Sequence, residues 1–208
     1  LQALGRDLRQ VLNWALSKSE SVLRAVISAI EGAGMVIADV IAWAKAAGDL
    51  ALQIVGEVLM RAGHTVEYIL LWVEKDGLTG IKAIVRGMLK AGAKLADLVA
   101  WTIKRGLQVI KDVASELLSL GVTLAQLIAE TMLYTESGLK NLIQAFKEIG
   151  KSVKDIVEAG LIQPAVDAGR RVLAALRDLG HTAVEIMNAA LDIGGSLLAL
   201  AFTLILEL

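Results

Sequence analysis

Apolar residues recur along this 208-residue chain with a helical period. Counting from Gly34, apolar side chains stand three, six and seven residues later, at Ile37, Val40 and Ile41. Spacings of i, i+3 and i+4 place side chains on one face of an α-helix, whereas a strand would alternate every second residue. The same three positions are apolar after most of the glycines that share this spacing. The pattern therefore predicts one amphipathic helix after each of these glycines, and no strand.

A second series of apolar stripes lies between the first ones. One of them runs through Leu52, Val55 and Leu59, again with helical spacing. Each unit is thus predicted to contain two helices of about 11 residues, joined by linkers too short for any arrangement but an antiparallel hairpin. Helices of this length are marginal alone in water, so their stability must come from packing against neighbours.

Glycine marks the unit boundaries at steps of 29 residues, with one step of 30 near the end. The predicted units begin near residues 5, 34, 63, 92, 121, 150 and 180. Glycine is favoured just after a helix, where the chain turns through a left-handed conformation, so these glycines should mostly have positive φ. Ser or Thr follows two residues after many punctuating glycines and is the predicted N-cap of the next helix. These residues are Thr65, Thr79, Thr123, Ser152, Thr182 and Ser196.

The predicted fold class is all-α, an α-solenoid of about seven short antiparallel hairpins, or about 14 helices. In this architecture the chain resembles tandem helical-hairpin repeat proteins, in which each hairpin contacts only its neighbours. The resemblance covers the whole sequence but points to no particular family. We expect residues 1–208 to form a single repeat array, cut from a longer one or associated with other copies.

The composition argues against several classes of function. The formal net charge of −1 does not favour a nucleic-acid partner, which needs a basic field. The chain contains no cysteine, so disulfides and thiolate metal sites are excluded. The longest apolar stretch, residues 194–208, is shorter than the roughly 20 residues of a membrane-spanning helix and includes Glu207. We therefore do not expect a membrane partner, despite the high mean hydropathy.

The four tryptophans follow the same 29-residue period, each nine residues after a unit glycine. They are Trp14, Trp43, Trp72 and Trp101. This position lies at the margin of the apolar face, so two interpretations remain: packing between repeats, which we favour, or a partly exposed aromatic ladder that binds a partner. The next two units carry Glu130 and Ala159 there, and a glutamate indicates that the column is partly open. The four tryptophans are therefore the candidate interaction surface.

Charged and imidazole side chains also follow the repeat. A basic column in the second helices is interpreted mainly as a solvated face, and comprises Arg24, Lys82, Lys111, Lys140 and Arg170. His64 and His181 each follow a unit glycine and are interpreted as turn residues, too far apart to share a metal. No nucleophile, phosphate-loop or zinc-binding motif appears. We therefore expect no catalysis, no cofactor and no metal.

The apolar C-terminal segment is a candidate assembly end. It carries Phe202, Leu204 and Leu208 and only one charge, whereas a terminal solenoid helix should be polar on its outer face. The sequence favours a non-enzymatic scaffold that binds protein or peptide, or further copies of itself. One alternative is a membrane-active or translocating segment of a larger secreted protein. Another is an engineered repeat protein, which the variation between units disfavours.

Overall fold

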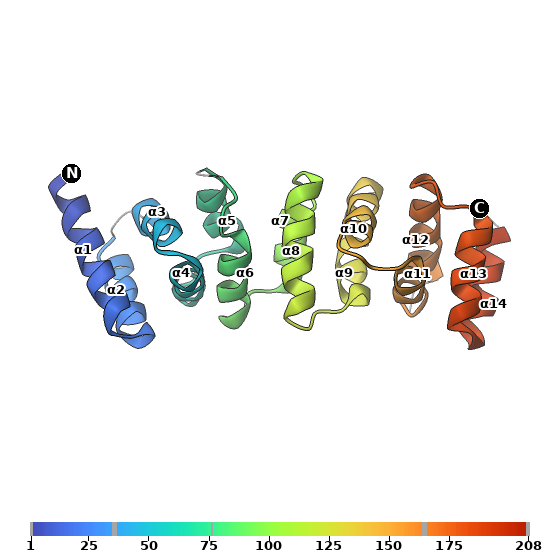
Figure 1. The fold of residues 1–208 in the computed structure, drawn as a ribbon, viewed down its shortest axis with the longest axis horizontal. Coiled ribbons are helices and arrows are strands. Elements are labelled where there is room, and N and C mark those ends of the chain that lie inside the picture. Colours follow the sequence, from blue (N-terminus) through green and yellow to red (C-terminus); the bar gives the residue numbers. More distant parts are fainter. Residues whose placement is uncertain (1, 35–36, 76, 164–165, 207–208) are drawn as a thin grey trace. The chain divides into compact units, whose positions relative to one another are not determined.

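A computed structural model describes residues 2–34, 37–75, 77–163 and 166–206. All regular secondary structure in these ranges is helical and forms fourteen helices, arranged as in Figure 1. The first helices of the hairpins are α1 (Gln2–Lys18), α3 (Ile37–Ala47), α5 (Val66–Lys75), α7 (Leu95–Thr102), α9 (Leu124–Thr131), α11 (Val153–Leu161) and α13 (Ala183–Ile193). The second helices are α2 (Glu20–Gly32), α4 (Asp49–Arg61), α6 (Ile81–Lys90), α8 (Leu107–Ser119), α10 (Glu136–Glu148), α12 (Val166–Asp178) and α14 (Gly195–Leu206).

The chain divides into two compact units, Leu1–Leu98 and Val99–Leu208, and the division falls within α7. In the first unit α1, α3 and α5 pack in succession, and so do α2, α4 and α6. In the second unit the successions are α9, α11 and α13, and α8, α10, α12 and α14. Each unit is therefore a two-layered stack of hairpins, which is α-solenoid packing and confirms the predicted fold class. The prediction of one array over residues 1–208 stays a prediction.

The turns confirm the role predicted for the periodic glycines. The six glycines at the unit boundaries from residue 34 onward have φ between +70° and +93°: Gly34, Gly63, Gly92, Gly121, Gly150 and Gly180. After Gly63, the His64 backbone N–H donates to the Leu59 carbonyl at 3.1 Å, which is the bond of a Schellman C-cap. The prediction is wrong at Gly5, which lies inside α1.

The helix starts are predicted in part. Three predicted N-caps close a capping box: Thr123, Ser152 and Thr182. The Thr65 hydroxyl accepts from the Tyr68 backbone N–H at 3.2 Å and caps α5 in the same way. Thr79 and Ser196 are not caps. Gly80, in a left-handed conformation, is the N-cap of α6, and Ser196 lies within α14.

The two layers meet along the predicted apolar stripes, and the even-numbered layer of the first unit is packed most closely. Gly56 of α4 and Gly87 of α6 are buried inside their helices rather than in turns. A Cβ atom built on Gly56 would lie 2.6 Å from the Ile84 carbonyl oxygen, and one on Gly87 would collide with the Gln53 carbonyl oxygen. These two glycines therefore let the backbones of α4 and α6 approach each other.

Candidate interaction surfaces

The structure places the four tryptophans in different environments. Trp14 is 54 % exposed, Trp72 is half-buried, and Trp43 and Trp101 are each 3 % exposed. The proposed interaction surface therefore needs correction: Trp43 and Trp101 are core residues and cannot meet a partner in this conformation. The interpretation as packing between repeats holds for Trp43.

Trp43 is buried because the preceding hairpin covers it. Its indole N–H donates to Asn13 Oδ1 at 2.8 Å, which joins α3 to α1. Arg9, Asn13, Trp43, Ala46 and Ala47 line a depression of about 250 Å³ beside this contact. The face of α3 that carries Trp43 thus turns toward the hairpin before it in the sequence.

Three of the tryptophans are approached by a cation about one helical turn further along the chain. Lys75 Nζ lies 3.9 Å from the centre of the Trp72 ring, and the Arg105 guanidinium lies 4.1 Å from that of Trp101. Lys18 Nζ lies 5.9 Å from Trp14, near the outer limit of a cation–π contact. The buried indole N–H groups of Trp72 and Trp101 have no hydrogen-bond partner among the described residues.

One face of α5, with the turn before it, gathers aromatic side chains into a continuous strip. His64 stacks on Tyr68 with ring centres 5.1 Å apart, and Tyr68 meets Trp72 edge to face at 6.4 Å. His64 Nε2 also lies within hydrogen-bond distance, 3.1 Å, of Glu31 Oε1 on α2. We call His64, Tyr68, Trp72 and Lys75 the α5 strip. Tyr68 is the most exposed ring of the α5 strip. The spacing of the tryptophans alone does not reveal this strip.

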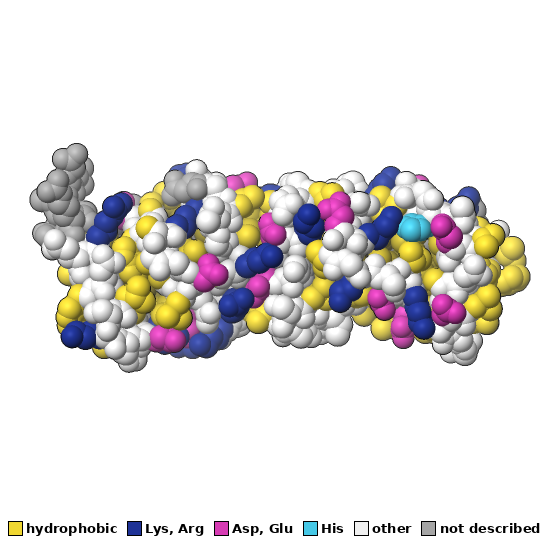
Figure 2. All heavy atoms as spheres, in the orientation of Figure 1, with side chains coloured by type: hydrophobic (Ala, Val, Ile, Leu, Met, Phe, Trp, Pro, Cys, Tyr) yellow, Lys and Arg dark blue, Asp and Glu magenta, His cyan; other side chains and the backbone are white. Residues whose placement is uncertain are grey.

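The basic column is not simply a solvated face, because several of its members pair with a carboxylate on the next hairpin. Arg24 of α2 lies 3.1 Å from Glu57 of α4. Lys111 of α8 lies 3.2 Å from Glu148 of α10. Lys140 of α10 lies 3.4 Å from Asp178 of α12. On the face drawn in Figure 2, basic and acidic side chains are interspersed rather than segregated. These ion pairs connect successive hairpins in the even-numbered layer.

Glu57 is the most deeply buried carboxylate in these three ion pairs. Its carboxylate also meets Arg61 at 2.8 Å and Lys90 of α6 at 3.7 Å. Burial by itself would raise the pKa of Glu57, but the hydrogen bond from Arg24 and the charges of Arg24, Lys90 and Arg61 outweigh it and lower the pKa below its ordinary value. The group therefore holds α2, α4 and α6 together as a charged cluster.

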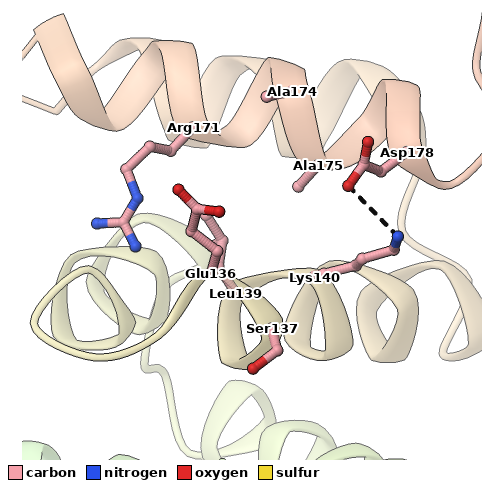
Figure 3. A pocket seen from close by; sticks show the side chains of 8 residues that line it. All are labelled: Glu136, Ser137, Leu139, Lys140, Arg171, Ala174, Ala175 and Asp178. Atoms are coloured by element: carbon pink, nitrogen blue, oxygen red, sulfur yellow. Dashed lines mark hydrogen bonds and ion pairs between the residues drawn. The ribbon is translucent and has the colours of Figure 1, made fainter.

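A groove of about 310 Å³ lies between α10 and α12 (Figure 3). Leu139, Ala174 and Ala175 contribute its apolar lining, and the small side chains of the two alanines leave the space open. Arg171 and Glu136 extend toward each other at one end, and the Lys140–Asp178 ion pair closes the other. The Arg171 guanidinium also donates to the Met132 carbonyl at 3.0 Å. Most of the polar groups already have protein partners, so the groove has the character of a gap between packed helices.

The C-terminal hairpin, α13 and α14, includes the described part of the predicted assembly end. Leu204 is buried in its own chain, since its side chain packs near Gly169 and Leu161. It is therefore not available to another copy, which corrects that part of the proposal. Phe202 is 52 % exposed, and Leu208 lies outside the described residues. Figure 2 shows apolar side chains gathered over this end of the chain.

The two histidines, the remaining candidates for metal binding or acid–base chemistry, have different partners. His64 contacts Glu31, whereas His181 Nδ1 lies 3.5 Å from Glu185 in its own turn. Among the described residues no three side chains of the metal-binding kinds gather in one place. None of the described helices combines the length and the hydrophobicity that crossing a bilayer requires. No protein-family model, no curated protein and no solved structure matches the chain.

Proposed function

We propose that this chain is a non-enzymatic scaffold of tandem hairpins, with a unit of 29 residues, that binds a protein segment through the α5 strip. The observation that carries the proposal is the continuous series of His64, Tyr68 and Trp72 along α5 and the turn before it, in which Tyr68 is exposed and the other two rings are half-buried, with Lys75 at its end. Aromatic side chains with a polar edge are enriched where proteins bind one another, because they offer large contact area and a hydrogen-bonding group.

The way in which the α5 strip is held in place also favours binding. All of its residues except His64 are held on α5, whose opposite face is buried and consists of Ile69, Leu70 and Val73. Two ring contacts and a cation–π contact restrict the side chains before any partner arrives, so binding loses little conformational entropy. The partner that suits the strip is an amphipathic helix with an apolar face and an acidic residue opposite Lys75.

Selection from a library of phage-displayed peptides, followed by titration of the selected peptides in solution, tests this function. We expect binders with apolar residues at helical spacing, and at least about ten-fold weaker binding to Tyr68→Ser, because such rings act as binding hot spots. Leu133→Ser is the matched control, since Leu133 is also exposed but lies after α9. If all selected peptides bind Tyr68→Ser as well as the unaltered protein, the strip is not the binding surface.

A second candidate function has one observation in its favour. Phe202 and Leu206 of α14 and Val184 and Leu191 of α13 are large apolar side chains that are at least half exposed. Such a face could also lie on a bilayer surface, as in a membrane-active segment. Leakage of a dye from anionic lipid vesicles tests this alternative. Leakage that Leu206→Glu abolishes would favour it over the scaffold.

A further inference from the structure

Exposure at matched positions shows that the first hairpin has an uncovered packing face. Val11 and Trp14 follow Gly5 by six and nine residues, as Val40 and Trp43 follow Gly34. Val40 and Trp43 are each 3 % exposed on a helix that packs on α1, to which Trp43 is hydrogen-bonded, whereas Val11 and Trp14 are 46 % and 54 % exposed. The face that joins α3 to the hairpin before it is therefore present on α1 without a neighbour among the described residues.

The last hairpin shows the complementary face. Leu161 and Leu191 each lie eleven residues after a unit glycine, Gly150 and Gly180 respectively. Leu161 is 3 % exposed because α13 and α14 pack on α11, whereas Leu191 is 54 % exposed. Val184, earlier on α13, is exposed as well. The side of α13 that would face a following hairpin is thus apolar and uncovered in the described part of the chain.

A polar marker distinguishes these two hairpins from the others. Asn13, which accepts the Trp43 indole hydrogen bond, stands eight residues after Gly5, and Asn188 stands eight residues after Gly180. The five intervening units have other residues at that position: Ala42, Leu71, Ala100, Ala129 and Glu158. Asn188 is exposed. The last hairpin therefore presents the same acceptor that receives a tryptophan in the first hairpin, and the indole N–H of the exposed Trp14 has no such acceptor among the described residues.

We propose that a second copy of this chain occupies these faces, with α1 of one copy docked head to tail on α13 of another. Val11 and Trp14 pack on Val184 and Leu191, and the Trp14 indole N–H donates to Asn188 Oδ1. The contact repeats the one between α3 and α1, so each half of it already exists inside the fold. It joins two different faces and is heterologous, so one copy can bind a partner at each end. The α5 strip takes no part in it.

Two variants that each block one face give a decisive experiment. Sedimentation velocity over a range of concentrations should show the unaltered protein associating beyond its monomer mass of 22.1 kDa. Trp14→Ser and Leu191→Glu change exposed side chains and should each weaken association at least about ten-fold, as loss of a hot spot does. An equimolar mixture of the two variants should form a dimer of one copy of each, because Leu191→Glu retains an intact α1 and Trp14→Ser retains an intact α13.

Further measurements separate this proposal from its rivals. Circular dichroism should show unchanged helix content in both variants. Tyr68→Ser should associate normally even where it loses peptide binding, so failure of the α5 proposal and failure of this one are distinguishable. The proposal is overturned if the unaltered protein stays monomeric, if Trp14→Ser associates as before, or if the mixed variants remain monomers. Binding of the monomer to anionic vesicles that Leu191→Glu abolishes would assign the C-terminal face to a membrane and also overturn it.

Discussion

Replacing Gly56 with alanine tests how closely α4 and α6 approach each other. The new Cβ atom would lie 2.6 Å from the Ile84 carbonyl oxygen and 2.8 Å from Ile84 Cγ1, whereas ordinary contacts begin at 3.4 Å. The oxygen belongs to the backbone of a helix and cannot rotate away. The helices must therefore separate locally by about 0.8 Å, and a gap of about 0.5–1 Å already loses a quarter to a half of each dispersion contact across it.

The size of the effect follows from the contacts at stake. A buried leucine-sized side chain makes roughly 50 contacts of about 0.15 kcal/mol, so losing a quarter of them costs about 2 kcal/mol. Alanine opposes this loss with a helix propensity about 1 kcal/mol better than that of glycine. More than one side chain lines the contact between α4 and α6, so we expect a net destabilisation of about 1–3 kcal/mol, the usual cost of overpacking.

Urea denaturation followed by circular dichroism measures this change as a lower midpoint. Gly32→Ala is the matched control, because no heavy atom lies within 4 Å of the added Cβ and its φ is not in the left-handed region. Its midpoint should be equal to, or higher than, that of the unaltered protein. If Gly56→Ala also raises the midpoint, the close contact between α4 and α6 is incorrect.

Two further predictions concern the turns and the buried charge. Gly92→Val should destabilise the folded protein by about 1–2 kcal/mol, because φ is +93° there and L-residues resist that conformation. Gly106→Ala, at φ −67°, should change the stability little. Equal denaturation midpoints for the two variants would contradict the turn assignment. The pKa of Glu57 is lower in the folded state than the ordinary value of 4.5. Its stabilisation is therefore complete above pH 4.5 and declines as the pH falls through the folded pKa. Glu57→Gln should cost about 1–3 kcal/mol at pH 7 and flatten the acid limb of stability against pH, and an unchanged acid limb would refute this role.

The elements that follow from local spacing could be predicted from the sequence. The boundary glycines carry positive φ from Gly34 to Gly180 because a left-handed turn is a local requirement that few other residues meet. Gly5 shares the spacing but lies inside α1, so the period alone does not decide whether a helix ends. The helix-interior glycines were not recognised, because their role is a long-range backbone contact. Their one sequence signal is that Gly56 and Gly87 interrupt apolar stripes away from the boundary positions.

The candidate site could be predicted less well from the sequence. The exposure of a side chain depends on which hairpins pack against it, and the repeat pattern does not reveal that. The tryptophan column is uniform in sequence, yet Trp14 and Trp43 differ in exposure since only one of them has a preceding hairpin in the described chain. The acidic partners of the basic column were also missed. Glu148 and Asp178 each stand two residues before a unit glycine, but Glu57 does not, so the three partners of the basic column do not form a column of their own.

The even-numbered and odd-numbered helices differ in how they hold successive hairpins together. In the even-numbered layer, ion pairs such as Arg24–Glu57 and the close approach at Gly56 fix one hairpin against the next, so this layer has little freedom to exchange neighbours. The odd-numbered helices carry the four tryptophans instead, and the contact between α1 and α3 includes the Trp43–Asn13 hydrogen bond. A single hydrogen bond of that kind contributes about 1 kcal/mol, which another protein surface can replace. We therefore expect that a peptide bound to α5, or a second copy bound to α1 and α13, would leave the contacts between the even-numbered helices undisturbed.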